Sequence, residues 1–267
     1  MDLGIRDKVA LVSGGSRGIG RAAADIFAEE GCRVVIAGRS PDALNSAVDS
    51  LKSAGAQVAG VVADMTDKAD IQRAVTFTRD TFDMPDIVVS NVHIGQGGGD
   101  GEGTFDTLTD EDYLAAFNDF TLSVIRLTRE VVPAMKAKRW GRLINIGSCA
   151  AREPPRALEH LLHNVARAPV VLLNKTLANE LGAFGITVNT IGTGWIATEA
   201  VEKFARDLNI GEDNMVRWVQ ENIGIPVGRF GKPREEGALI AFLASEYGGF
   251  LTGNWIPFDG GEHRSAW

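Results

Sequence analysis

Short apolar runs alternate with longer segments of helical spacing along the 267-residue chain. Runs rich in Val, Ile and Leu lie at 8–15, 32–39, 56–65, 86–91, 141–148 and 185–192, and a further extended run covers 253–261. Helical patterns lie at 19–31, 40–55, 67–82, 108–139 and before residue 185. Buried strands that alternate with such helices are typical of a parallel sheet with helices on both faces. The pattern predicts one doubly wound α/β domain over residues 1–267.

The composition is that of an ordinary globular protein, with 45% hydrophobic and 23% charged residues. A formal net charge of −8 argues against nucleic acid as a general partner. No apolar run reaches the length of a membrane span, and the N-terminus lacks the apolar region of a signal peptide. Cys32 and Cys149 follow no metal-binding or disulfide pattern. We therefore expect a cytoplasmic protein that acts on a small molecule, without a metal and without a membrane partner.

A glycine-rich turn, SGGSRGIG, joins the first apolar run to the first helical segment. Its glycines have the spacing Gly-x3-Gly-x-Gly, which differs from the more common Gly-x-Gly-x2-Gly. Such a turn brings backbone N–H groups and the positive end of a helix against a pyrophosphate. We expect a dinucleotide here; the alternative is a tight turn without a ligand. The turn residues expected to contact the dinucleotide are Gly14, Ser16, Arg17, Gly18, Ile19 and Gly20.

The end of the second apolar run indicates which dinucleotide binds. An acidic residue at this place would hold the ribose 2′-hydroxyl of NAD, but this chain has Arg39 and Ser40. Arg39 and Arg17 supply two guanidinium groups that can bind a 2′-phosphate. We expect NADP(H) rather than NAD(H); the alternative is that one or both arginines are ordinary surface charges. Ser40 is also the expected N-cap of the helix at 40–55.

Several motifs extend this picture over nearly the whole chain. They are SGGSRGIG, VVADMTD, VVSNVHIG, WGRLINIGS, GITVNTIGTGWIAT and the run from GRFGKPREEG to PFDGG. With these motifs the chain resembles a short-chain dehydrogenase/reductase (SDR) of the ketoacyl-reductase-like kind. It departs from that family at Ser90, Val92 and His93 in the turn after the fourth run, and at Thr193, where a proline is usual.

The resemblance implies further contacts with the cofactor. Asp64, with Met65 beside it, would contact the adenine, and Asn91 would lie along the adenine ribose. Ile196 and Thr198 would hold the nicotinamide carboxamide.

The resemblance also implies a substrate lid at 193–227 and a homo-tetramer or homodimer, with the C-terminal segment between subunits. Four large apolar residues of the lid could line a substrate pocket or form the lid's own packing: Trp195, Phe204, Met215 and Trp218.

The residues that carry the family's chemistry are altered. That chemistry uses a serine for the substrate oxygen, a tyrosine for the proton, a lysine four residues later and an asparagine on the preceding helix. Ser148 matches the serine, although a strand-end residue that caps the next turn would look the same. No Tyr-x3-Lys occurs in the chain. Counting back from GITVN places His163 at the tyrosine's position and Arg167 at the lysine's, with His160 as a lesser candidate. Phe120 falls at the asparagine's position.

His163 and Arg167 lie four residues apart and therefore share one face of a helix. Arg167 can donate to ribose hydroxyls, as the lysine does. Its charge disfavours the protonated imidazole, so His163 should be a usable general base at neutral pH. The alternative is a polar helix residue in a site that lost its chemistry. Asn164 and Arg167 also resemble the Asn-x2-Arg of a divergent SDR branch, whose members carry a glycine- or proline-rich loop like that at 93–103.

Three functions fit these residues. The first is an SDR-type oxidoreductase that transfers hydride between NADP(H) and a carbonyl or secondary alcohol, through Ser148, His163 and Arg167. The second is a non-redox enzyme on the same scaffold, such as an aldolase, a dehydratase or an isomerase, with His163 as the base. The third is a protein that binds NADP(H) without turnover.

Overall fold

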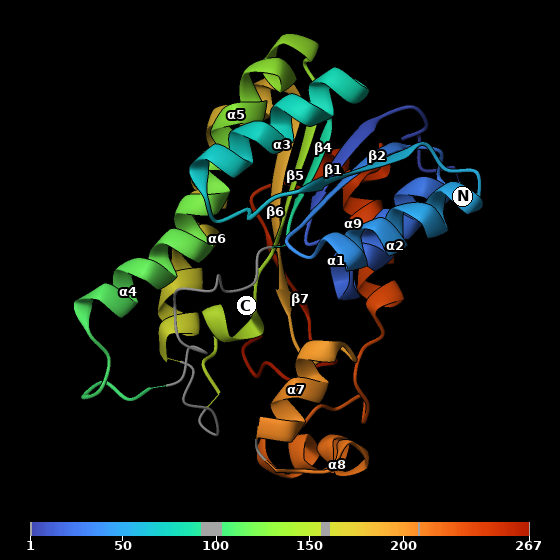
Figure 1. The fold of residues 1–267 in the computed structure, drawn as a ribbon. Coiled ribbons are helices and arrows are strands. Elements are labelled where there is room, and N and C mark those ends of the chain that lie inside the picture. Colours follow the sequence, from blue (N-terminus) through green and yellow to red (C-terminus); the bar gives the residue numbers. More distant parts are fainter. Residues whose placement is uncertain (1, 92–102, 156–160, 208, 267) are drawn as a thin grey trace.

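The computed structural model describes residues 2–91, 103–155, 161–207 and 209–266. Its sheet is entirely parallel, with the strand order β3-β2-β1-β4-β5-β6-β7 (Figure 1). The strands are β1 (Val9–Ser13), β2 (Arg33–Gly38), β3 (Val58–Val62), β4 (Ile87–Ser90), β5 (Gly141–Ile146), β6 (Ile186–Thr193) and β7 (Trp255–Phe258). Each strand begins and ends within three residues of the apolar run that predicts it, so the doubly wound α/β fold is confirmed.

Helices cover both faces of the sheet (Figure 1). One face carries α1 (Gly18–Glu29), α2 (Pro41–Ser53) and α9 (Pro233–Ala244). The other carries α3 (Lys68–Thr81), α5 (Ser123–Lys138) and α6 (Leu161–Leu181). The helices α7 (Glu199–Asp207) and α8 (Glu212–Asn222) lie together below the ends of the strands in the view of Figure 1. None of the helices in the described ranges is long and apolar enough to cross a membrane.

The apolar runs form strands because both faces of the sheet are covered. Side chains of neighbouring strand residues point to opposite faces. In β1, Val12 accordingly packs in the core cluster beneath α1 and α9, whereas Leu11 packs in the cluster beneath α3 and α5. A strand buried on both sides carries few polar positions, which is why the sequence shows continuous apolar runs and not alternation.

The segment 108–139, for which one or two helices were expected, contains α4 (Asp110–Phe117) and α5 joined by a π-helical turn at Asn118–Leu122. The hydroxyl of Thr121 in this turn donates to the carbonyl of Ala166 in α6 at 2.7 Å. Single π-turns are frequent at functional sites. Here the turn sets the direction of Phe120 toward α6.

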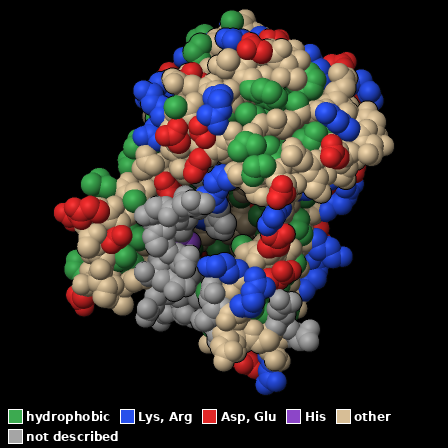
Figure 2. Space-filling view, in the orientation of Figure 1, with side chains coloured by type: hydrophobic (Ala, Val, Ile, Leu, Met, Phe, Trp, Pro, Cys, Tyr) green, Lys and Arg blue, Asp and Glu red, His purple; other side chains and the backbone are tan. Residues whose placement is uncertain are grey.

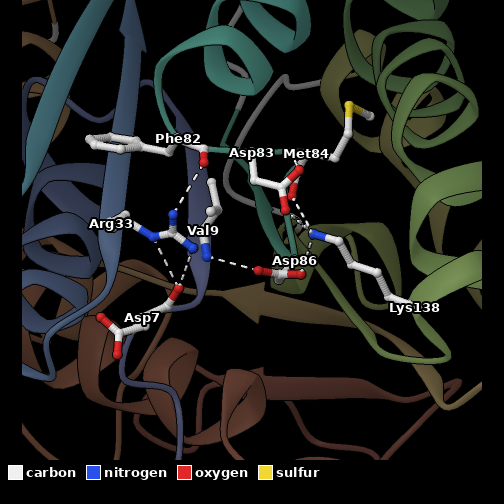
Figure 3. A network of polar contacts seen from close by, with 8 residues as sticks. All are labelled: Asp7, Val9, Arg33, Phe82, Asp83, Met84, Asp86 and Lys138. Atoms are coloured by element: carbon white, nitrogen blue, oxygen red, sulfur yellow. Dashed lines mark hydrogen bonds and ion pairs between the residues drawn. The ribbon is translucent and has the colours of Figure 1, made fainter.

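A polar network ties the starts of β1, β2 and β4 together (Figure 3). The buried carboxylate of Asp86 accepts the backbone N–H of Val9 at 2.9 Å and the ammonium of Lys138 at 3.0 Å. Arg33 donates to the carbonyls of Asp7 at 2.8 Å and Phe82 at 3.1 Å. These bonds hold the amino ends of the strands in register, and the opposite, carboxyl ends carry the candidate site.

The chain order of the strands reverses between β1 and β4, which are neighbours in the sheet. The connections after these two strands lead to opposite faces, so their carboxyl ends diverge and leave a crevice. Ligands of open α/β sheets bind in such a crevice. The glycine-rich turn follows β1, and Asn91 follows β4, so both border it.

Candidate active site

The glycine-rich turn adopts a backbone that requires its glycines. Gly14 and Gly18 have φ values of +62° and +55°, in the left-handed region that favours glycine. Gly20 has a different constraint, because a Cβ there would lie 2.4 Å from the carbonyl oxygen of Gly14. The N-terminus of α1 therefore approaches the end of β1 as closely as glycine permits. An exposed backbone and a helix N-terminus at this place fit a pyrophosphate.

Asn91 supports this turn from β4. Its backbone N–H donates to the hydroxyl of Ser13 at 2.7 Å, and its side-chain amide donates to the carbonyl of Gly14 at 3.5 Å. A Cβ on Gly14 would lie 2.6 Å from the carbonyl oxygen of Asn91. The residue expected along the adenine ribose thus lies directly against the glycine turn.

The residues expected at the 2′-phosphate lie around the end of β2. The hydroxyl of Ser16 lies 3.2 Å from the position of a Cβ on Gly38, and Arg39 follows as an exposed residue. Ser40 caps α2 by accepting the N–H of Ala43 at 3.4 Å, as predicted.

Arg17 takes a different direction in this structure. Its guanidinium forms a 2.8 Å ion pair with Glu199 at the start of α7, and both side chains are more than half exposed. An exposed pair of this kind contributes little to stability. The ion pair connects the glycine turn to the proposed lid. It directs the Arg17 guanidinium to Glu199, and not to the 2′-phosphate position expected beside Arg39.

Two residues expected near the adenine are held by the chain itself. The carboxylate of Asp64 accepts the N–H of Thr66 at 3.0 Å and its hydroxyl at 2.8 Å. Met65 is buried in the core cluster beneath α3. A contact from Met65 to a ligand would therefore come from its backbone.

The loop after β6 reaches the glycine turn. Ile196 is buried and pairs with Gly231 as an isolated β-bridge. The methyl group of Thr198 lies 3.4 Å from the position of a Cβ on Gly18. Ile196 and Thr198, expected at the nicotinamide carboxamide, thus lie within one loop that touches the start of α1.

An open groove of about 470 Å³ runs between this loop, α1 and α9, from Gly18 and Thr198 to Lys232. Figure 2 shows a hollow between the helical body and the segment that carries α7 and α8, with charged side chains around it. The groove lies at the cofactor turn and away from the predicted catalytic residues.

Ser148 follows β5 and caps the next short helix, Cys149–Ala151. Its oxygen accepts the N–H of Ala150 at 3.1 Å. The alternative reading of Ser148 as a turn-capping residue is therefore confirmed. It does not conflict with the first reading, because a hydroxyl that accepts one bond still has its own hydrogen to donate.

Arg167 lies directly against the strand end that carries Ser148. Its guanidinium donates to the carbonyl of Gly147 at 3.5 Å and lies 4.4 Å from the ring centre of Phe120. The ring of Phe120 also meets the ring of His163 edge-on at 5.4 Å. Phe120 thus lies between the two altered residues. Burial lowers the pKa of Arg167 to about 10, which leaves the guanidinium charged at neutral pH.

A small cavity of about 20 Å³ adjoins this cluster. It is lined by Ser90, Phe120, Asn145, Gly147 and Arg167, with other residues of the same strands and helices. One water needs about 10–15 Å³ measured in this way. The cavity can therefore hold one water, with polar groups on its wall.

The segment 193–227 forms a small core of its own. Met215 is buried with Val219, and Trp195 packs against Phe204 with ring centres 5.5 Å apart. Phe204 in turn contacts Trp218 at 6.1 Å. These large apolar residues could line a substrate pocket or pack against one another, and in the structure they pack against one another.

The close association of the C-terminal segment with the loop after Ser148 was not predicted. Glu153 accepts the N–H groups of Arg264 at 2.6 Å and Ser265 at 2.7 Å. The thiol of Cys149 donates to Glu262 at 3.6 Å, and burial raises the pKa of Glu262 to about 7. These contacts are made within one chain.

The buried acid Glu236, in α9, was also missed. It accepts a hydrogen bond from the hydroxyl of Thr193, and burial raises its pKa to about 7. A signal was present in the sequence, since Glu236 lies four residues before the buried Ile240 and thus on the apolar face of its helix.

Two predictions fall outside the described residues. His160, the lesser candidate for the proton-transfer position, lies in 156–160. Nearly all of the loop at 93–103 lies in 92–102.

Comparisons with known proteins show the family of the chain. Residues 14–263 match the family model described as enoyl-(acyl carrier protein) reductase. The 3-oxoacyl-(acyl-carrier-protein) reductase FabG of Escherichia coli is 32% identical to this chain, over 95% of this chain and 96% of the relative. The chain belongs to the short-chain dehydrogenase/reductase family.

Solved structures of oxidoreductases also match this chain over nearly its whole length. L-sorbose reductase from Gluconobacter frateurii, complexed with NADPH and L-sorbose, matches with a TM-score of 0.91 and 32% identity, over 99% of this chain and all of that one. An NADPH-bound short chain oxidoreductase from Pseudomonas aeruginosa, described as containing an atypical catalytic center, matches with a TM-score of 0.87 and 29% identity. That match covers 97% of this chain and 98% of the other.

The close contact at Gly20 gives a first prediction. In Gly20→Ala the added methyl group collides with the carbonyl of Gly14, so α1 must move away from the turn. We expect the affinity for a dinucleotide to fall at least about tenfold, measured by fluorescence titration with NADPH. Gly182→Ala is the matched control, because nothing lies within 4 Å of a Cβ there. Equal affinities of both variants would contradict this view of the turn.

Proposed function

We propose that the protein is an NADP(H)-dependent oxidoreductase that acts on a carbonyl or secondary alcohol, with an altered catalytic centre. The observation that carries the proposal is the position of Arg167. Its guanidinium contacts Gly147, the residue before Ser148, at the carboxyl ends of the strands where the glycine turn also lies. A fixed cation at this place is suited to ribose hydroxyls, which accept its N–H groups.

The bound dinucleotide would supply or accept hydride at its nicotinamide ring. The chain's own residues would bind and orient it. Gly14, Gly18 and Gly20 would present backbone N–H groups to the pyrophosphate, because their turn and the start of α1 face the crevice. Ile196 and Thr198 would orient the carboxamide, and Arg167 the adjoining ribose.

Ser148 is proposed to bind the substrate oxygen. Its oxygen already accepts the N–H of Ala150, so its hydrogen is the part available to a ligand. In the reduction direction this hydrogen bond stabilises negative charge that develops on the carbonyl oxygen. In the oxidation direction it orients the hydroxyl.

His163 or a water is proposed to move the proton. The cavity beside Phe120 and Arg167 can hold one such water. The fixed charge of Arg167 favours a neutral imidazole, because a protonated one would face a like charge. A neutral imidazole accepts a proton readily, so alcohol oxidation is the direction that this arrangement favours.

The NADP(H) preference is tested at Arg39. In Arg39→Ala the 2′-phosphate loses a charged partner, and the affinity for NADPH should fall by about tenfold or more, while the affinity for NADH should stay the same. Both are measured by fluorescence titration. Arg79→Ala removes an exposed arginine on α3 and is the control for net charge. Tighter binding of NADH than of NADPH by the wild type would overturn this assignment.

The role of His163 is tested with His163→Gln and His163→Phe, which cannot titrate. If the imidazole is the base, turnover should fall by about a hundredfold or more, and its dependence on pH should flatten. The assay follows absorbance of the reduced nicotinamide with a panel of ketones and alcohols that includes L-sorbose. Unchanged turnover in both variants would remove His163 from the mechanism and leave the water.

The same assay separates the other functions. Product formation without turnover of the nicotinamide would indicate an aldolase, dehydratase or isomerase. Binding of NADPH with no product from any substrate in the panel would indicate a protein without turnover. Either result contradicts the proposed oxidoreductase activity.

We also propose that the chain is a homo-tetramer or homodimer. Leu114 on α4 and Leu172 on α6 are 69% and 72% exposed, and Val165, one heptad before Leu172, is also exposed. Exposed apolar side chains that gather on neighbouring helices are typical of a subunit interface. Light scattering should give a mass two or four times 28.6 kDa, and Leu172→Glu should lower it. A wild-type monomer at micromolar concentration would rule the assembly out.

A further inference from the structure

Glu236 is a carboxylic acid with no exposed surface, in the first part of α9. Its Oε1 accepts the hydroxyl of Thr193 at 2.5 Å. Its Oε2 is buried without a hydrogen-bond partner among the described residues. A buried carboxylate with a single neutral donor is unfavourable, and burial raises the pKa of Glu236 to about 7. The site therefore gains or loses a proton near neutral pH.

The partner of Glu236 is the residue that begins the cofactor loop. Thr193 is the last residue of β6, and the loop that follows leads to Ile196 and Thr198. This loop is tied to the segment before α9 at a second place, because Gly231 donates to Trp195 and accepts from Ala197, both at 2.9 Å. Movement of Thr193 relative to α9 would therefore move the loop proposed to hold the nicotinamide.

The other side of α9 fixes Glu236 relative to the pyrophosphate end of the site. A Cβ on Gly237 would lie 2.9 Å from the backbone of Ala22 in α1, so the two helices are in close contact. The N-terminus of α1 is the proposed pyrophosphate site. Glu236 thus joins the helix that would bind phosphate to the loop that would bind nicotinamide.

Most of the charged groups on the elements that pack near Glu236 form ion pairs. On α1, Arg21 pairs with Asp25, and Glu29 pairs with Arg234 of α9. Arg17 and Glu199 form a further ion pair, as do Arg229 and Glu235. Lys232 and Glu202 line the groove, and the buried Arg142 on β5 lies over the ring of Trp140, which donates to Glu246. The pKa of Glu236 is shifted by burial and by Thr193 without a contribution from these charges.

We propose that Glu236 is a positioning residue for the dinucleotide: it holds the 194–198 loop through Thr193 and takes up a proton from solvent when the anionic ligand binds. The proposal rests on the proposed binding of NADP(H). Thr193 departs from the family pattern, since it replaces the usual proline, which has no hydroxyl to donate. The proposal assigns the departure a function in cofactor binding.

The proton linkage has a definite sign. At low pH Glu236 is neutral with and without ligand, so binding is not opposed. At high pH the ligand must bind beside a buried negative charge, and its affinity falls. A charge roughly 10 Å from a carboxyl shifts that carboxyl's pKa by about one unit in a protein of ordinary effective dielectric constant. The expected loss of affinity across neutral pH is therefore about tenfold.

The experiment measures the dissociation constant of NADP+ by titration calorimetry at pH 6 and pH 8.5, in buffers of different ionisation enthalpy. The variants are Glu236→Gln, Glu236→Leu and Thr193→Val, with Glu221→Gln as control, because Glu221 is an exposed acid on α8 that changes net charge equally. The 2′-phosphate of the ligand titrates by itself. Its contribution is the same in every variant and cancels in the comparison with wild type.

From pH 6 to pH 8.5 the affinity of the wild type for NADP+ should fall about tenfold more than the affinity of Glu236→Gln does. Glu236→Gln should also take up fewer protons on binding. Thr193→Val, which breaks the hydrogen bond, should bind more weakly than the wild type. Glu236→Leu, which breaks the bond and also removes the charge, should bind more weakly at pH 6 and lack the additional loss of affinity at pH 8.5, and Glu221→Gln should behave as wild type.

Parallel pH dependence and proton uptake in wild type and Glu236→Gln would overturn the proposal while leaving NADP(H) binding intact. A wild type that binds no dinucleotide would refute the proposed function, and this proposal with it. Should Glu236→Leu fail to fold, as judged by circular dichroism, the isosteric Glu236→Gln decides the question alone.

Discussion

The site depends on the close approach of α1 to the end of β1. Gly20 lies so near the carbonyl of Gly14 that no side chain fits between them, and Asn91 holds the same turn from β4. This contact points the N-terminus of α1 into the crevice between β1 and β4 and exposes the turn's backbone. The two face-covering helix layers and the polar network at Asp86 keep the strands in the register that this contact needs.

The second half of the site is built from a different interaction. Arg167 is buried against the ring of Phe120 and the carbonyl of Gly147, so its charge has a fixed position beside Ser148. His163, one helical turn before Arg167, meets the same ring edge-on. Phe120 contacts both His163 and Arg167, so the altered positions form one cluster.

The fold could be predicted because apolar runs and helical spacing are local properties of the sequence. The glycine turn and the cap at Ser40 are local too, and both are found where they were predicted. His163 and Arg167 could be counted back from a recognisable motif because they lie on a regular helix, whereas Phe120 lies in a π-helical turn that the sequence did not indicate. The pairing of Thr193 with Glu236, the docking of the C-terminal segment on Glu153 and the ion pair of Arg17 with Glu199 could not be placed in this way.

Those contacts join segments far apart in the chain, and their partners are set by tertiary packing. The same limit applies to the segment 193–227. Its sequence shows several large apolar residues, but the sequence does not determine whether they face a substrate or each other. In the structure Trp195, Phe204 and Trp218 pack together. The segment 193–227 forms a small apolar core, and its residues Thr198 and Glu199 contact the glycine turn.

The most direct measurement is a crystal structure of the protein with NADPH bound. The account predicts that the nicotinamide ribose hydroxyls lie within hydrogen-bonding distance of the Arg167 guanidinium, with the carboxamide at Ile196 and Thr198 and the 2′-phosphate at Arg39. A cofactor whose ribose lies away from Arg167, with that guanidinium still confined to Phe120 and Gly147, would contradict it.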